Sequence, residues 1–267
     1  MISRLSAAAA DSLSDCLLCT SSKCSSFFNA SSALSALKKD KRFAKSEIGF
    51  IGHSEGGAAV AIAASRNTTV PFIVVLASMG INGLELAHSQ ATTKIKRTFF
   101  AMPEADYIKF SEGIYQQLKI IAENEELDSI KQRLGDYIRE RYRLFPEDFG
   151  KMSMDESVQG FHNLLLQPRL ISYVQFQPEL YYSQIACPAY IVCGSGDTQV
   201  DCEVNLKGIE RIFQAANKKN YKSEIIDGMD HSLKKSAPSK KDDVPDFKYD
   251  PTFNDMCTKV ANWVKEV

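Results

Sequence analysis

The stretch that decides the fold is IGFIGHSEGGAAVAIAA, at residues 48–64. Its first part, up to Gly52, is a short apolar run bounded by turn residues, which is typical of a strand buried on both faces. Residues 55–66 are small and rich in alanine, which predicts a helix that packs closely on a sheet. Ser54 lies between the two, inside a G-x-S-x-G motif. The stretch therefore predicts a serine on a tight turn from a strand into a helix.

This motif, called a nucleophile elbow, holds its serine in a strained backbone conformation. Gly52 and Gly56 would avoid clashes between the strand and the helix because they carry no side chain. The helix start would present backbone N–H groups to a developing oxyanion, so we expect the N–H of Glu55 to be one oxyanion donor. His53 is expected to line the pocket wall. In the alternative interpretation the glycines are ordinary turn residues and Ser54 is only a helix N-cap.

A serine hydroxyl needs a base to take its proton, and that base needs an acid to orient it. Asp197 follows the strand-like run AYIVCGSG, and His231 follows EIIDGMD. This gives the order serine, acid, histidine, so Ser54, Asp197 and His231 are the candidate catalytic triad. The alternatives are a turn aspartate and a satisfied surface histidine. Asp201 and Asp230 are rival acids, although neither ends a strand.

Segments on both sides of the elbow extend the α/β pattern. Residues 71–78 and the run that starts at Pro188 predict further strands, and helix and strand alternate as in the βαβ units of a parallel sheet. Long amphipathic stretches, notably 107–124 and 126–144, separate them and predict a helical cap. The expected fold class is α/β, with an α/β-hydrolase-type, mostly parallel sheet and an inserted cap. The expected domains are a weakly structured Ser/Ala-rich segment at 1–32, a core at 33–80 and 183–267, and a cap at 81–182.

Composition excludes several classes of partner. The 267 residues contain 32 basic and 33 acidic side chains, for a net charge of −1, so no general field attracts nucleic acid. No apolar run approaches the roughly 18 residues that span a bilayer. Asp11 and Asp15 interrupt the apolar N-terminus, so no signal peptide is expected and the expected compartment is the cytoplasm. No metal or nucleotide motif is present, and His88 and His162 lie too far apart in sequence to suggest a metal site, so no cofactor is implied.

The seven cysteines form an odd set in a chain of ordinary size, which is not the pattern of a disulfide-stapled secreted domain. We therefore expect reduced thiols. Cys16 and Cys19 form a C-x-x-C, but no second pair follows at zinc-finger spacing.

The quoted motifs resemble those of bacterial α/β-hydrolases of the dienelactone-hydrolase-like and prolyl-oligopeptidase-like branch, which are esterases or acyl hydrolases. The resemblance covers about residues 33–267 and implies a carboxyl-ester hydrolase fold with Ser54, Asp197 and His231 in the triad roles. The matching segments are IGFIGHSEGGAAVAIAA (48–64), IVVLASMGING (73–83), PAYIVCGSGDTQVDCEVN (188–205) and EIIDGMDHSLKKS (224–236).

The chain departs from this group before the elbow. Family members carry their first strands there, together with an H-G-x-G loop that gives the second oxyanion donor. Only 51 residues precede Gly52, and none of them reads H-G. We therefore expect a sheet that lacks its N-terminal part, whose exposed edge would invite self-association.

The leading functional hypothesis is a serine hydrolase that cleaves small-molecule carboxylic esters or thioesters through an acyl-enzyme. A serine peptidase or an acyltransferase of the same fold is one alternative. A truncated, inactive remnant that acts as a binding or structural protein is another. An acyl pocket could be lined by aromatic side chains of the cap, although a stripe at helical spacing more often forms the core. They are Phe99, Phe100, Tyr107, Phe110 and Tyr115.

Overall fold

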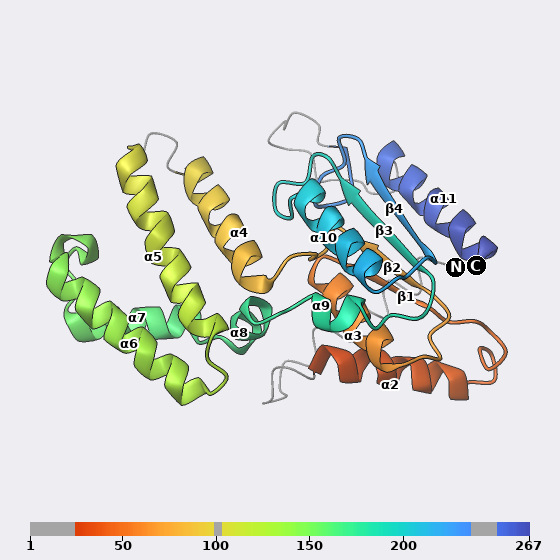
Figure 1. Ribbon diagram of the computed structural model, residues 1–267, viewed down its shortest axis with the longest axis horizontal. Helices are drawn as coiled ribbons and strands as arrows, with labels where there is room; N and C mark the ends of the chain where they lie inside the picture. Colours follow the sequence, from red (N-terminus) through yellow and green to blue (C-terminus); the bar gives the residue numbers. More distant parts are fainter. Residues whose placement is uncertain (1–24, 99–102, 236–249) are drawn as a thin grey trace. The chain divides into compact units, whose positions relative to one another are not determined.

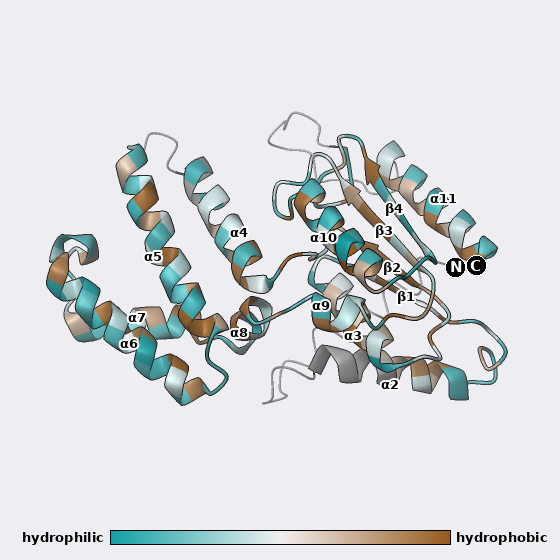
Figure 2. Cartoon of the chain, viewed as in Figure 1, coloured by the Kyte–Doolittle hydropathy of each residue, from teal (hydrophilic) through white to brown (hydrophobic). Residues whose placement is uncertain are grey.

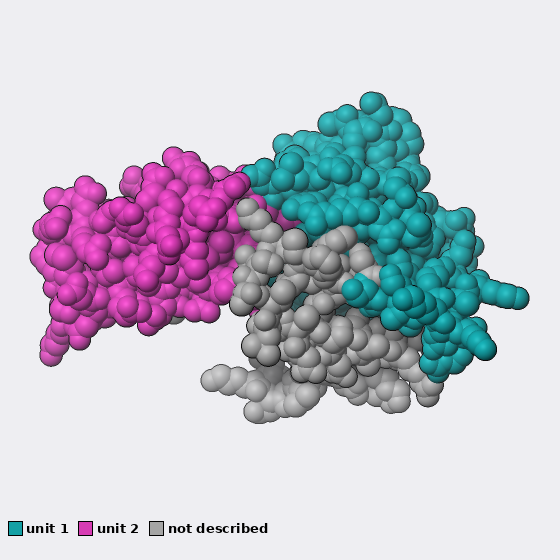
Figure 3. All heavy atoms as spheres, turned by 90° about the horizontal axis from the view of Figure 1, so that it is seen from below, with its two compact units in different colours: residues 1–81, 177–267 teal, residues 82–176 magenta. Residues whose placement is uncertain are grey.

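The computed structural model describes residues 25–98, 103–235 and 250–267. The chain forms two compact units. Unit 1 lies within residues 1–81 and 177–267, and unit 2 within residues 82–176 (Figure 3).

Unit 1 is built on a four-stranded parallel sheet (Figure 1). Its strands, in spatial and sequence order, are β1 (Phe50–His53), β2 (Ile73–Leu76), β3 (Ala189–Gly194) and β4 (Tyr221–Ile226). All residues of β2 and β3 are buried, and these two strands carry largely hydrophobic residues (Figure 2). The register sets His53 beside Leu76, so the end of β1 lies level with the end of β2. The predicted α/β class and parallel sheet are confirmed.

Helices cover both faces of this sheet. Val74 and Tyr190 pair in register and pack in one cluster with Trp263 of the last helix, α11 (Pro251–Glu266). Successive strand residues point to opposite faces. Val75, which lies against α3 (Glu55–Arg66), and Cys193, which is bonded to α10 (Cys202–Ala215), therefore belong to the other face. The helices of unit 1 are α2 (Ser25–Lys39), α3 (Glu55–Arg66), α9 (Glu179–Tyr182), α10 (Cys202–Ala215) and α11 (Pro251–Glu266).

Two of the expected domain boundaries differ from the structure. Residues 25–32 were expected to be weakly structured, but they belong to helix α2, which packs against α3 and buries Leu34. The rest of that segment, residues 1–24, lies outside the described residues. The cap was expected to extend to 182, but residues 177–182 belong to unit 1. Tyr182 explains this assignment, because its fully buried ring makes an edge contact with Phe213 of α10.

Unit 2 is helical throughout its described part. Its helices are α4 (Gly83–Thr98), α5 (Glu104–Ala122), α6 (Leu127–Leu144), the 3-10 turn η1 (Pro146–Phe149), α7 (Met154–Leu165) and α8 (Pro168–Val174). One apolar cluster contains the fully buried Ile121, Ile130 and Leu134, and a second contains Ile138 and Phe149. A capping box between Ser153 and Glu156 starts α7. None of the described helices combines the length and the apolar character that crossing a bilayer requires.

β1 lies at one end of the strand order and leaves Ile51 49% exposed. An apolar residue on an edge strand is a potential pairing surface. The expected self-association stays a prediction.

Candidate active site

Ser54 occupies the turn between β1 and α3 with a positive φ of 55°. Non-glycine residues rarely adopt this region, so the conformation has to be held by neighbouring contacts. The Ser54 N–H donates to the Leu76 carbonyl at 2.8 Å, and the Ser54 carbonyl accepts the Gly57 N–H at 2.9 Å. The same carbonyl also accepts the Ser78 hydroxyl at 2.6 Å. The next strand, the first turn of the helix and the Ser78 side chain thus fix the serine in place.

The glycines around Ser54 differ in whether the structure leaves room for a side chain. A Cβ at Gly52 would lie 2.2 Å from the Gly56 carbonyl oxygen, so only glycine fits there without a backbone shift. A Cβ at Gly56 would meet no atom within 4 Å, so the steric reason expected for this glycine is absent. The close approach falls instead on Gly57, whose Cβ would lie 2.4 Å from the Ser78 hydroxyl oxygen. In the sequence, this close approach is marked only by the second glycine of the Gly56-Gly57 pair.

The structure brings the three predicted catalytic residues together within unit 1. His231 Nε2 lies 3.0 Å from Ser54 Oγ, and His231 Nδ1 lies 2.8 Å from Asp197 Oδ2. A carboxylate only accepts, so Nδ1 carries the hydrogen, and Nε2 of the neutral ring then accepts the Ser54 hydroxyl. The Asp197 side chain is fully buried and that of His231 is 14% exposed. This arrangement can move a proton from the serine to the imidazole, with the imidazolium stabilised by a buried carboxylate.

The loop that follows β3 holds Asp197 rigidly. Asp197 Oδ1 accepts the N–H groups of Gln199 and Val200 at 2.8 and 2.9 Å, which leaves Oδ2 to face His231. A disulfide between Cys193 and Cys202, with a Cα–Cα distance of 5.6 Å, closes the loop around the aspartate. The expectation of reduced thiols is therefore wrong for these two cysteines. Their spacing alone did not reveal the pair, because the loop brings them together across nine positions.

The rival acids have other roles. The Asp201 carboxylate accepts the Val204 N–H at 2.9 Å and caps the N-terminus of α10. The Asp230 carboxylate accepts the Ser232 N–H at 2.8 Å and holds the turn that carries His231. Asp197 is the acid that the structure places on the imidazole.

His53 connects the elbow to the histidine loop. Its Nε2 lies 2.7 Å from the His231 carbonyl oxygen, and the two rings are 5.0 Å apart between centroids. A carbonyl can only accept, so His53 Nε2 carries the hydrogen and donates it. His53 keeps an exposed edge, but the desolvation that its packed neighbours cause lowers its pKa. Sequence reasoning placed His53 on the pocket wall and missed this contact, because it is made to a backbone atom 178 positions away.

Glu55 begins α3 directly after Ser54. The first N–H groups of a helix point out of its N-terminus, where the helix dipole is positive. The role of the Glu55 N–H as an oxyanion donor next to the serine stays a prediction.

The remaining two histidines make hydrogen bonds within unit 2. His88 Nε2 lies 3.0 Å from the Ser111 hydroxyl oxygen, and His162 Nε2 lies 2.9 Å from the Lys131 carbonyl oxygen. Within residues 25–98, 103–235 and 250–267, no group of three His, Cys, Asp or Glu side chains is placed to hold a metal ion.

The serine turn and the order of the three residues along the chain agree with a known fold. The serine follows a strand on a sharp turn into a helix, and the acid and the histidine follow β3 and β4 in the order serine, acid, histidine. Both features are those of α/β-hydrolases.

Comparison with known proteins gives structural similarity alone. No protein-family model matches the sequence, and no curated protein matches it. The structure is similar to an esterase from Pyrococcus furiosus, with 16% identity and a TM-score of 0.40 over 75% of this chain and 52% of that chain. This chain thus spans about half the length of that esterase.

Two further solved structures resemble the chain. A lipase-esterase related protein from Clostridium acetobutylicum has 11% identity and a TM-score of 0.44, over 89% of this chain and 74% of that chain. A monoacylglycerol lipase from Paleococcus ferrophilus has 15% identity and a TM-score of 0.42, over 91% and 75% respectively.

Proposed function

We propose that this chain is an α/β-hydrolase-type serine hydrolase that cleaves small-molecule carboxylic esters or thioesters through an acyl-enzyme. The observation that carries the proposal is the continuous hydrogen-bonded path from Ser54 through His231 to Asp197, with distances of 3.0 and 2.8 Å. Three residues from three separate loops converge at the carboxyl end of the sheet, where this fold places its chemistry.

In the first half-reaction Ser54 Oγ attacks the ester carbonyl carbon while His231 Nε2 takes the hydroxyl proton. The Glu55 N–H donates to the oxyanion of the tetrahedral intermediate. Collapse of the intermediate breaks the bond to the leaving oxygen or sulfur, and His231 gives its proton to that atom. The alcohol or thiol departs and the acyl group stays on Ser54.

In the second half-reaction His231 takes a proton from a water molecule, which attacks the acyl carbon. A second tetrahedral intermediate collapses, Ser54 recovers its proton from His231, and a carboxylic acid is released. A peptidase would share the first half-reaction with an amine leaving group. An acyltransferase would share it too, but an alcohol or amine would replace the water.

The test is labelling with a fluorophosphonate probe, which reacts with activated serines. Wild-type protein should label, whereas Ser54→Ala and His231→Ala should not. Ser65→Ala and His162→Ala serve as matched controls, because each removes the same side chain from a helix outside the site, and both should label like wild type. A folded wild-type protein that does not label would contradict the proposal and favour a non-catalytic binding or structural role.

Substrate class is tested by turnover. Short-chain p-nitrophenyl esters and acyl thioesters should release product with Ser54-dependent kinetics. A peptide anilide that reacts faster than the matched ester would favour the peptidase. Transfer to an added alcohol at the expense of hydrolysis would favour the acyltransferase.

A further inference from the structure

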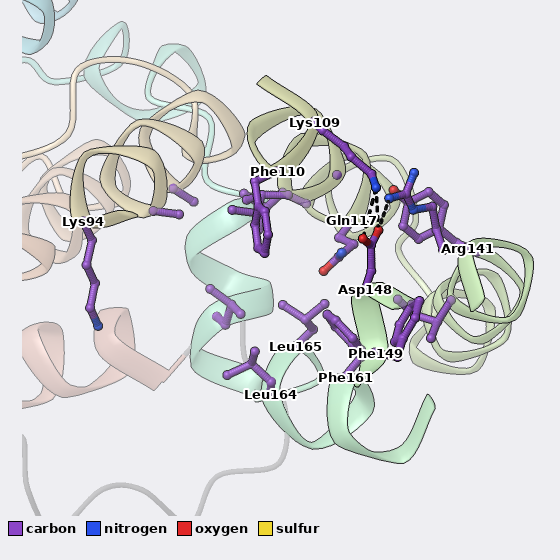
Figure 4. A pocket seen from close by; sticks show the side chains of 18 of the residues that line it. Lys94, Lys109, Phe110, Gln117, Arg141, Asp148, Phe149, Phe161, Leu164 and Leu165 are labelled. Atoms are coloured by element: carbon purple, nitrogen blue, oxygen red, sulfur yellow. Dashed lines mark hydrogen bonds and ion pairs between the residues drawn. The ribbon is translucent and has the colours of Figure 1, made fainter. Parts of the chain in front are cut away.

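Unit 2 contains a cavity of about 1130 Å³ that is formed by its own helices (Figure 4). Its walls are mostly apolar and aromatic, with Phe110 of α5, Phe149 of η1, and Phe161, Leu164 and Leu165 of α7 among them. This volume slightly exceeds the 300–1,000 Å³ typical of small-molecule sites. Of the aromatic residues expected to line an acyl pocket, Phe110 lies here, Tyr107 and Tyr115 line a smaller pocket, and Phe99 and Phe100 lie outside the described residues.

The cavity wall exposes apolar side chains to solvent. Phe110 is 56%, Met152 47% and Leu164 64% exposed. Exposed apolar residues that gather around one concave surface indicate a binding site more often than isolated ones do. An apolar chain that filled the cavity would bury them.

One side of the cavity carries a cationic cluster. Lys109 Nζ and Arg141 Nη2 each lie 3.0 Å from the Asp148 carboxylate, and Figure 4 shows the three side chains together there. Both cations also stack on the Phe145 ring at 4.4 Å. An ammonium has three donors and a guanidinium five, so two cations bridged by a single carboxylate retain donors for a second oxyanion. All charged residues of the lining, Lys94, Asp106, Lys109, Arg141 and Asp148, sum to one positive charge.

We propose that this cavity binds a long-chain carboxylate, with its alkyl chain against the apolar wall and its carboxylate on Lys109 and Arg141. Charge complementarity selects this occupant over a neutral or cationic amphiphile, because one anionic group balances the single excess positive charge. The proposal does not depend on hydrolysis by Ser54, although a carboxylate is also the product class of that reaction.

Gly113 offers a direct way to block the cavity. It lies in α5 and lines the cavity, and a Cβ there would meet only the Tyr137 hydroxyl oxygen, at 3.8 Å. Gly113→Leu should therefore fill the space without a backbone clash. Gly160→Leu is the matched control, since Gly160 is an exposed helical glycine of α7, lies outside the lining, and would place a Cβ that meets no atom within 4 Å.

The experiment is calorimetric titration of the full chain with Ser54→Ala as background, using hexanoate, decanoate and dodecanoate below their critical micelle concentrations. Affinity should rise about fourfold per added methylene. Gly113→Leu should weaken dodecanoate binding at least tenfold, and Gly160→Leu should leave it unchanged. A chain-length series without any trend, or equal affinity in both glycine variants, would overturn the proposal.

The charge requirement is tested separately. The double variant Lys109→Gln/Arg141→Gln should weaken dodecanoate binding roughly tenfold to hundredfold. Lys119→Gln lies on the same helix as Lys109 but outside the cavity lining, and it should leave dodecanoate binding unchanged. Dodecyltrimethylammonium should bind wild-type cavities more weakly than dodecanoate, and equal binding of the two would contradict the assigned ligand class. The titrations do not use turnover, so failure here and failure of the proposed hydrolysis are distinguishable.

Discussion

The two units of this chain build their proposed sites in different ways. In unit 1 the site is made of strand ends, where backbone hydrogen bonds hold Ser54 and Asp197 in fixed positions. In unit 2 the described chain is helical, and the cavity is shaped by side chains that pack between helices. The site in unit 1 is therefore set by backbone geometry and should tolerate few substitutions. The cavity in unit 2 is set by side-chain volume, so its size should change gradually as its lining residues are substituted.

The largest effect is expected at Asp197, the proposed acid of unit 1. Asp197→Asn keeps the size of the side chain but removes the charge that, in the proposed mechanism, orients and stabilises the protonated His231. We expect kcat to fall about 10⁴-fold, with little change in KM. Steady-state kinetics on a p-nitrophenyl ester measures this, and Asp201→Asn is the control, since that carboxylate caps α10. A variant that kept more than a tenth of wild-type activity would show that Asp197 is not the acid.

The next effect concerns the packing of unit 2. Leu134 is fully buried in the first apolar cluster, so Leu134→Ala should reduce the free energy of unfolding by about 2–5 kcal/mol. Leu164→Ala, at an exposed position, should change it by less than about 0.5 kcal/mol. Urea denaturation followed by circular dichroism compares the two. Equal losses would mean that the cavity wall is as tightly packed as the core.

Substitutions at Gly52 and Gly56 test how much space the backbone leaves for side chains in the turn at Ser54. Gly52→Ala places a methyl group against the Gly56 carbonyl oxygen, so it should cost about 1–3 kcal/mol and abolish fluorophosphonate labelling. Gly56→Ala meets no atom within 4 Å and should label nearly as well as wild type. The opposite ranking would show that the turn is not held as described.

The smallest effect is expected at His53, whose contact with the His231 carbonyl is worth about 0.5–1.5 kcal/mol. Its pKa is lowered in the folded protein by desolvation, so between that value and the unfolded value near 6.5 the unfolded chain binds more protons. Stability should therefore fall as the pH drops through about 6.5. His53→Gln should remove this part of the pH dependence, as measured by Tm between pH 7.5 and 5. An unchanged pH profile would contradict this role for His53.

The sequence predicted the parts of unit 1 that depend on local pattern. Buried strands, the close approach at Gly52, and an acid and a histidine that follow strands are all visible along the chain, so Ser54, Asp197 and His231 could be named before the structure. The contact between Ser78 and the Ser54 carbonyl could not, because Ser78 lies beyond the next strand and carries no motif. The disulfide was missed because the curvature of the acid loop sets the distance between its cysteines.

In unit 2 the helices could be predicted from the sequence, but the cavity between them could not. Amphipathic periodicity correctly predicted α5 and α6, since it reports which side of each helix is apolar. It does not report how far apart two apolar faces pack. The same pattern therefore describes a filled core around Leu134 and an open cavity beside Phe110, and only the packing separates them.

Trapping the acyl-enzyme tests most directly whether Ser54 is the nucleophile. Wild-type protein would be mixed with p-nitrophenyl acetate, quenched in acid within the first turnover, digested and mapped by mass spectrometry. We expect a burst of p-nitrophenol close to one per chain and a single acetyl group on the peptide that contains Ser54. Hydrolysis that proceeds with no acetyl group on Ser54, or with the group on another residue, would show that Ser54 is not the nucleophile.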